Sequence, residues 1–125
     1  MILLTIDEIS ALHDKLIART GGSHGLRDKA LLESAVYSTM SGFDGNEAYP
    51  TVEEKAARLM YSLTNNHAFV DGNKRIGVLT MLMTLRLNNV VIGYTQDELI
   101  SLSLSVADGT IEYTGILNWI TEHKY

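Results

Sequence analysis

Three segments of the chain have the spacing of a capping box, in which a hydroxyl residue starts a helix and a carboxylate three positions later bonds back to it. They run from Thr5 to Glu8, from Thr51 to Glu54 and from Thr95 to Glu98. Each is followed by apolar residues at intervals of three and four, which is the periodicity of a helix with one buried face. The three starts therefore predict a chain built mainly from α-helices.

The same periodicity, followed along the chain, predicts six helices joined by short loops. We expect them over residues 7–19, 29–39, 52–65, 74–88, 96–107 and 113–122. Gly21 and Gly22 can adopt the positive φ angles that end the first helix, and Asp28 is a good cap for the second. The turn-rich segment Ser41–Pro50 holds the only proline and predicts a loop or a short hairpin. Residues 90–92 are expected to form a short extended piece.

The fourth expected helix is apolar on most of its sides. Its apolar residues are Ile76, Val78, Leu79, Met81, Leu82, Met83, Leu85 and Leu87. A helix that is apolar nearly all round usually lies at the centre of its domain. We therefore predict an all-α bundle of about six helices around a central buried helix, folded as a single domain over residues 1–125.

Charge and composition exclude several classes of function. The net charge of −5, from 10 Lys and Arg against 15 Asp and Glu, argues against broad nucleic-acid binding, which needs a basic face. The absence of cysteine excludes disulfides, thiol catalysis and thiolate metal sites. No run of about 18 apolar residues is present, so no membrane span is expected. The apolar start of the chain lacks the basic flank of a signal peptide, and we expect a cytoplasmic protein.

The segment between the third and fourth helices concentrates ionisable and amide side chains. Within nine residues it holds His67, Asp71, Gly72, Asn73, Lys74 and Arg75. It opens into the first turn of the most apolar helix, where unpaired N–H groups and the positive end of the helix dipole favour anions. This placement predicts an anion-binding loop, in which the glycine would allow the backbone to approach a ligand closely.

Two cations in the first turn oppose the helix dipole, and each costs roughly a few tenths of a kcal/mol. A bound anion between Lys74 and Arg75 would offset that cost, which favours a phosphate-containing ligand. Asp71 is the ligand type that Mg²⁺ prefers when phosphate oxygens complete its shell. His67 can accept a proton near neutral pH, and Asn73 could cap the helix or contact a phosphate oxygen.

Each of these residues also has an ordinary structural explanation when it is taken alone. A histidine before a buried helix, an Asp-Gly-Asn turn and two solvated cations are all common, and only their combination favours function. Three further histidines, His13, His24 and His123, are given no role, and His123 is expected to be exposed. No pair of histidines has zinc-ligand spacing on one helix. Arg27 and Asp28 are expected to be structural.

The loop His67-x-Phe69-x-Asp71-Gly72-Asn73-Lys74-Arg75 resembles the signature loop of the Fic/Doc superfamily, in particular its death-on-curing (Doc) branch. The resemblance extends over nearly the whole chain. The segment 21–28, the Leu31-Leu32-Glu33-Ser34-Ala35 stretch, Tyr49-Pro50 and the ending after Trp119 also look like that branch. The implied fold is an all-α Fic/Doc domain.

Fic enzymes typically transfer AMP from ATP to a protein hydroxyl, and their loop has a glycine at the position of Lys74 and an arginine at that of Val78. Both differences match the Doc branch. Doc proteins are toxins of type II toxin–antitoxin systems; they phosphorylate a threonine of elongation factor Tu and so arrest translation. A small Phd-like antitoxin neutralises them by folding its C-terminal segment as a helix against the toxin, for which we expect an apolar groove.

The resemblance assigns a role to each residue of the loop. His67 would be the general base, Asp71 would bind Mg²⁺, and Gly72, Asn73, Lys74 and Arg75 would hold the phosphates of ATP. Phe69 would anchor the loop in the core. The segment 41–50 would take the place of the family's flap, which docks the target protein.

Three alternatives to a toxin kinase remain open from the sequence. One is a nucleotidyltransferase that moves AMP at the same site, because two positions alone distinguish the two reactions. Another is a catalytically inactive binding module. A third is a DNA-binding helical regulator, against which the acidic charge balance argues.

Overall fold

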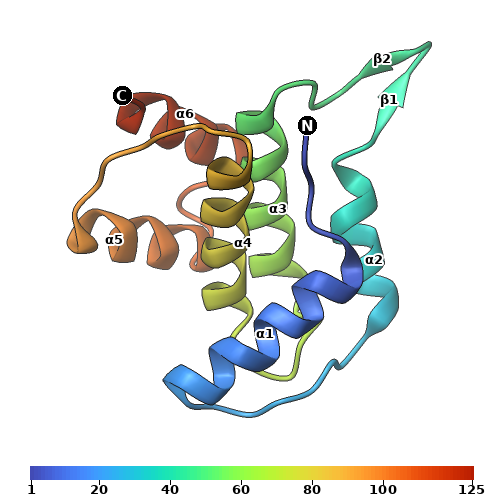
Figure 1. Cartoon of the computed structure of the whole chain (residues 1–125), viewed down its shortest axis with the longest axis vertical. Helices are drawn as coiled ribbons and strands as arrows, with labels where there is room; N and C mark the ends of the chain where they lie inside the picture. The colour runs from blue at the N-terminus through green and yellow to red at the C-terminus, as the bar shows by residue number, and fades with distance from the viewer.

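The computed structural model describes all residues from Met1 to Tyr125 and is almost entirely helical (Figure 1). Its elements are α1 (Ile6–Thr20), α2 (Lys29–Ser38), β1 (Gly42–Phe43), β2 (Asn46–Glu47), α3 (Val52–Asn66), α4 (Asn73–Leu87), α5 (Gln96–Ala107) and α6 (Tyr113–His123). The predicted all-α architecture of six helices is confirmed, and each helix begins and ends within two residues of its expected bounds.

The three predicted capping boxes are present. At α1, Glu8 N donates to Thr5 Oγ1 over 3.1 Å while Thr5 N donates to Glu8 Oε1 over 2.9 Å. The starts of α3 and α5 have the same reciprocal pair of bonds. Asp28 caps α2 by accepting a hydrogen bond from Leu31 N, as expected. These local bonds fix where four of the six helices begin.

The pair α3 and α4 forms the middle of the molecule, with α1 and α2 on one side and α5 and α6 on the other (Figure 1). Gly77 of α4 allows the two central helices to approach closely, because a Cβ there would overlap Thr64 Oγ1 and crowd Met60 O. Two groups of buried side chains result. One joins α1, α2, α3 and the start of α4, and the other joins α3 and α4 to α5 and α6.

The fourth helix is central, but it is not buried on all sides. Ile76, Met81 and Leu85 are buried completely or nearly so. Leu79 and Leu82 are only half-buried, because the gap between α1 and α5 leaves this side of α4 partly uncovered. The prediction that this apolar helix is central to the bundle is confirmed, and its partly uncovered side forms the floor of an apolar groove.

The segment between α2 and α3 is a hairpin, one of the two predicted alternatives. Gly42 pairs with Glu47 and Phe43 with Asn46 in antiparallel register. Its base is held by Lys55 of α3, which is 4% exposed. The Lys55 ammonium donates to Thr39 O over 2.7 Å and to Glu47 Oε1 over 3.0 Å. The hairpin projects from the body of the molecule beyond the N-terminal end of α3 (Figure 1).

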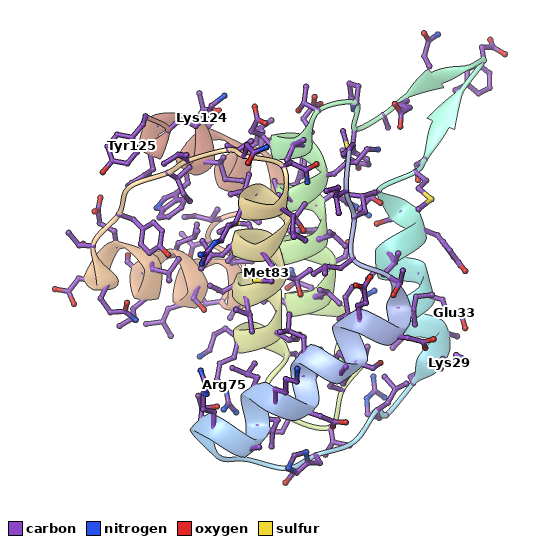
Figure 2. All side chains as sticks on the ribbon, viewed as in Figure 1. Lys29, Glu33, Arg75, Met83, Lys124 and Tyr125 are labelled. Atoms are coloured by element: carbon purple, nitrogen blue, oxygen red, sulfur yellow. The ribbon has the colours of Figure 1, made fainter.

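The extended piece predicted after α4 pairs with the C-terminus. Ile92 forms an antiparallel bridge with Lys124, and Tyr125 N donates to Val91 O over 3.1 Å. The labelled Lys124 and Tyr125 mark this end of the chain in Figure 2. No helix in the structure combines the length and the apolar character that crossing a membrane requires.

The expectation that His123 would be exposed is wrong. Its side chain is 15% exposed and stacks on Trp119. Its Nε2 lies 2.8 Å from Glu98 Oε2 and its Nδ1 lies 2.7 Å from Trp119 O. Both ring nitrogens face acceptors, so the protonated ring is favoured and the pKa of His123 is raised, first by its hydrogen bond with Glu98.

Candidate active site

The loop between α3 and α4, which we call the His67–Arg75 loop to include the first turn of α4, has a backbone set by two left-handed residues. His67 ends α3 with φ 53° and ψ 45°, and Gly72 precedes α4 with φ 76°. Between them, Phe69 inserts its ring into the core and is 2% exposed. The prediction that Phe69 anchors the loop agrees with this burial.

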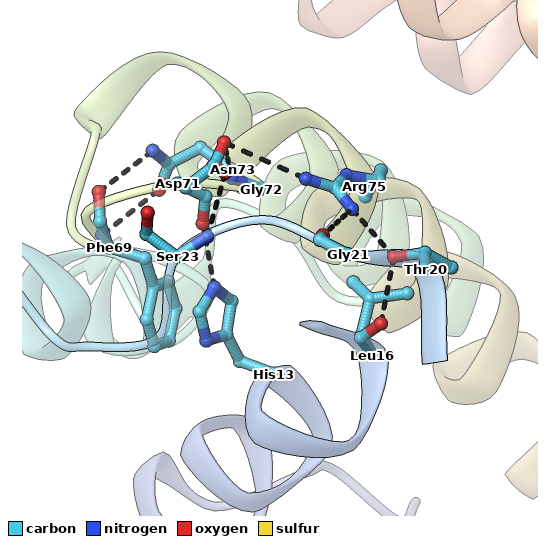
Figure 3. Close-up of polar contacts among 10 residues, drawn as sticks. All are labelled: His13, Leu16, Thr20, Gly21, Ser23, Phe69, Asp71, Gly72, Asn73 and Arg75. Atoms are coloured by element: carbon cyan, nitrogen blue, oxygen red, sulfur yellow. Dashed lines mark hydrogen bonds and ion pairs between the residues drawn. The ribbon is translucent and has the colours of Figure 1, made fainter. Parts of the chain in front are cut away.

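Asn73 closes the loop through its side-chain amide. Its Nδ2 donates to Phe69 O and its Oδ1 accepts from Phe69 N, each over 3.0 Å (Figure 3). The side chain does not cap α4, whose N-cap residue is Gly72. The two bonds to Phe69 fix the orientation of the amide, and the backbone N–H of Asn73 is left without an acceptor and free for a ligand.

The segment after α1 runs alongside the loop and fixes it. Arg27 N and Asp28 N both donate to Ala68 O, and Val70 N donates to Gly25 O over 3.0 Å. The Arg27 guanidinium donates through Nε to His67 O over 2.7 Å. The structural role expected for Arg27 is thus confirmed, and its partner is the backbone of the loop itself.

His13 is a loop contact that the sequence interpretation missed. It is 1% exposed, its ring stacks on Phe69 with centroids 3.9 Å apart, and its Nε2 lies 2.7 Å from Asp71 O (Figure 3). The only sequence signal was its position on the apolar face of the first helix, near Ile9 and Ile17. That position predicts that His13 is buried, but it does not predict which residues His13 contacts.

The Asp71 carboxylate is held by backbone donors from two segments. Ser23 N donates to Oδ2 over 3.0 Å, Gly72 N donates to Oδ1 over 2.8 Å, and Arg75 Nη2 lies 3.6 Å from Oδ1. The two backbone hydrogen bonds, first that of Ser23, lower the pKa of Asp71 below its ordinary value. The carboxylate is therefore charged at neutral pH, and its side chain is still 45% exposed.

The donor set around Asp71 fits Mg²⁺ better than zinc. Each carboxylate oxygen keeps a lone pair free beside its one backbone donor, and the side chain is open to solvent. No group of three or more His, Cys, Asp and Glu side chains gathers at any point of the structure. A cation here would take most of its ligands from phosphate oxygens and water, as Mg²⁺ commonly does.

The first turn of α4 presents free backbone donors. The first helical bond runs from Ile76 N to Gly72 O, and the N–H groups of Asn73, Lys74 and Arg75 have no acceptor in the structure. Lys74 is exposed. Arg75 is turned toward the end of α1, where Nη1 donates to Thr20 Oγ1 and Gly21 O over 2.6 and 2.8 Å (Figures 2 and 3). This arrangement can cradle an anion.

All the predicted site residues line one depression of about 440 Å³ on the surface. They are His67, Asp71, Gly72, Asn73, Lys74 and Arg75, joined by Thr64, Val70 and Ala107. The hairpin does not contribute to it. The length of α3 separates the hairpin from the loop (Figure 1), so the structure does not bring the expected flap to the site.

A family described as Fic/DOC matches residues 3–85, which include the whole His67–Arg75 loop. The chain belongs to the Fic/Doc family. It is 43% identical over 70 residues to a protein named Toxin Doc from Mycolicibacterium smegmatis, a match that covers 56% of this chain and about half, 54%, of that protein. It is also 30% identical over 110 residues to a protein named Protein kinase doc from Escherichia phage P1, covering 88% of this chain and 86% of the relative. The predicted resemblance to the Doc branch is confirmed.

Beside its signature loop, this Fic/Doc chain has an apolar groove of about 390 Å³ between α1, α4 and α5. Leu16, Val78, Leu79, Leu82, Leu99, Ile100 and Leu104 supply its apolar lining, and Lys74 and Arg75 stand at its edge. Ile100 and Leu104 are 48% and 51% exposed. The apolar groove predicted from the resemblance is therefore present, and it borders the candidate active site.

Proposed function

We propose that this chain is a Doc-like toxin that transfers the γ-phosphate of ATP to a serine or threonine hydroxyl of a protein of the translation machinery, such as elongation factor Tu. The observation that carries the proposal is that His67, Asp71 and the first turn of α4 line one depression. A base, a metal-binding carboxylate and an anion cradle are the parts that phosphoryl transfer needs. The relatives named as a toxin and as a protein kinase support it.

In this mechanism His67 accepts the proton of the target hydroxyl as its oxygen attacks the γ-phosphorus. The bond between that phosphorus and the β-phosphate oxygen breaks, and ADP leaves. The side chain of His67 is exposed at the end of α3 and so is open to a large protein substrate. General bases of this kind contribute about 10²–10⁴-fold in rate.

The cations and N–H groups of α4 stabilise the negative charge of the transferring group. Lys74 and the free N–H donors lie in the depression, and Arg75 enters it beside Asp71. Asp71 would hold Mg²⁺, which supplies further positive charge to the phosphate oxygens. Gly72 leaves the N-cap position free of a side chain.

The proposal that phosphate and not AMP is transferred rests on the residues at two positions of α4. Lys74 replaces the glycine and Val78 the arginine of the AMP-transferring loops, and Val78 lines the apolar groove rather than the depression. No second arginine therefore stands one turn further along α4 to hold the terminal phosphates of ATP. This favours release of ADP over release of pyrophosphate.

A label-transfer experiment separates phosphate from AMP transfer. The purified chain is incubated with elongation factor Tu and ATP labelled at either the γ or the α position. Label from the γ position alone, abolished by His67→Ala, is the expected result. Label only from the α position would establish the nucleotidyltransferase alternative. If His67→Ala is folded and arrests growth as well as wild type does, the chain is instead an inactive binding module.

The apolar groove supports a second part of the proposal, an antitoxin partner. A Phd-like helix with apolar residues on one face would cover Leu79, Leu82 and Leu104. Because Lys74 and Arg75 edge the same groove, such a helix would lie next to the site and block it. The partner's gene is expected beside that of this chain.

We also infer that residues 1–125 form one cooperative domain, because α3 and α4 contribute to both groups of buried side chains. Calorimetric and van't Hoff enthalpies of unfolding should then agree. Two separate transitions would show that the halves on either side of α3 and α4 unfold independently.

A further inference from the structure

His13 lies 58 residues before Asp71 in the sequence, yet it touches the His67–Arg75 loop at two points. Its ring is nearly parallel to that of Phe69, with an interplanar angle of 11°, and its Nε2 is within hydrogen-bond distance of Asp71 O. A buried polar side chain normally needs such a partner. What sets His13 apart is that the partner is the backbone of the candidate metal ligand.

The backbone carbonyl of Asp71 has the His13 imidazole as its hydrogen-bond donor. Asp71 precedes the N-cap residue Gly72, so its carbonyl lies outside the hydrogen-bond ladder of α4, which begins with Ile76 N and Gly72 O. No backbone N–H donates to Asp71 O. The Nε2–H of His13 is therefore the donor that satisfies this carbonyl, and it fixes the protonated nitrogen of the ring.

The same peptide unit also holds the carboxylate. In a trans peptide the C=O and N–H groups point in opposite directions. The C=O of Asp71 points at His13, so the N–H of Gly72 points away from it and donates to Asp71 Oδ1 over 2.8 Å. Rotation of this peptide away from His13 would move the N–H away from the carboxylate.

We propose that His13 is a positioning residue for the transfer reaction, which orients the Asp71–Gly72 peptide and, through it, the Asp71 carboxylate. The inference rests on the function proposed above for Asp71. His13 lies beneath the loop and does not line the depression, so it acts through Asp71 and Phe69 and does not touch the substrate.

Two substitutions separate the contacts of His13. His13→Phe keeps an aromatic ring against Phe69 but removes the donor to Asp71 O. His13→Gln removes the ring but keeps an N–H near the position of Nε2. If orientation of the peptide matters most, His13→Phe lowers kcat by about 10- to 100-fold, as small misplacements in active sites do, and His13→Gln restores most of it. The KM for ATP changes less, because Lys74 and the N–H groups of α4 remain.

Hydrogen exchange of the free protein gives a readout that does not need activity. The hydrogen-bonded amides of the loop, those of Phe69, Val70 and Gly72, exchange faster in His13→Phe than in wild type, and the amide of Gly72 shows the largest change. In His13→Gln they remain close to wild type. Ile116→Val serves as the control, because Ile116 is fully buried in the other group of core side chains and its truncation lowers stability without a contact to the loop.

Unchanged exchange and unchanged kcat in a folded His13→Phe protein would overturn the proposal. So would equal losses in the Phe and Gln variants with faster exchange throughout the chain, because that pattern describes a core residue without a specific role. If wild type transfers no phosphate, the proposed function fails, and the exchange pattern of the two variants still decides whether His13 orients the loop.

Discussion

Gly22 lies against the Asp71 carboxylate so closely that a β-carbon on Gly22 would overlap Asp71 Oδ2. The neighbouring amide of Ser23 can donate to the same oxygen because the chain turns there with a φ of 114° at Gly22. From the sequence, the glycine pair after α1 is predicted to end the helix. In the structure, Gly22 also allows the backbone to come close enough to the Asp71 carboxylate for Ser23 N to donate to it.

Gly22→Ala is therefore expected to destabilise the protein by about 2–3 kcal/mol, from backbone strain and from displacement of Asp71. Gly109→Ala is the matched control, because Gly109 has a φ of 85° and no neighbouring atom within 4 Å of the added carbon. The control should lose only about 1–2 kcal/mol. Urea denaturation measures both. Equal losses in the two variants would mean that the contact with Asp71 adds nothing.

The buried ammonium of Lys55 supports the hairpin. Lys55→Met leaves the carbonyl of Thr39 without its donor, and a loss of about 1–3 kcal/mol is expected for such a buried group. Lys124→Met is the control, since Lys124 pairs with Glu53 at the surface, where a salt bridge contributes at most about 1 kcal/mol. Thermal unfolding of both variants tests this. A smaller loss for Lys55→Met than for Lys124→Met would contradict it.

The pair of His123 and Glu98 makes stability depend on pH. The folded-state pKa of His123 is raised above 6.5, so its contribution is complete below 6.5 and is lost as pH rises through the folded value. The pKa of Glu98 is lowered from 4.5, first by the Thr95 backbone, so its contribution is lost as pH falls through the folded value. The pair should therefore stabilise the fold most between about pH 4.5 and 6.5.

Melting temperatures of wild type and His123→Gln, measured from pH 5 to pH 9, test this dependence. The wild-type value should fall relative to the variant as the pH rises above about 6.5. His24→Gln is the control, because His24 is exposed and its ring contacts the exposed carboxylate of Asp14 over 3.4 Å. Parallel curves for wild type and His123→Gln would contradict the assignment.

The groove along α4 gives a prediction about the partner. Leu104→Glu places a charge in its apolar lining and should prevent a stable complex with the antitoxin partner proposed above, while the proposed phosphate transfer is retained. Phe43→Glu is the control for complex formation, since Phe43 is an exposed apolar residue on the hairpin, 81% accessible. Co-purification after co-expression measures the outcome. A complex that survives Leu104→Glu would place the partner elsewhere.

Much of the fold could be predicted because its signals are local. The capping boxes at Thr5, Thr51 and Thr95 and the cap at Asp28 each involve residues three positions apart, so the sequence shows both partners together. The apolar periodicity then follows the helices to their ends. Six site residues within nine positions were likewise recognisable as one cluster, because a single loop and helix start carry all of them.

The remaining features depend on pairs that are distant in the chain. Ser23 and His13 reach Asp71 from 48 and 58 residues away, and no spacing rule predicts those contacts. The amide of Asn73 had two good uses at a helix start, and its actual partner, the backbone of Phe69, depends on how the loop closes. The burial of His123 could not be predicted, because its position near a chain end does not show that residues 91–93 pair with that end.

The hydrogen bond between His13 and the Asp71 carbonyl also bears on how such proteins diverge. Loss of the donor at position 13 leaves a carbonyl unpaired unless the loop changes as well, and a bulkier residue at 69 displaces the ring at 13. We therefore expect positions 13 and 69 to change together among descendants of a common ancestor, as residues whose side chains are in contact do. The structural unit that is inherited together would then include α1 as well as the signature loop, although the two are far apart in the sequence.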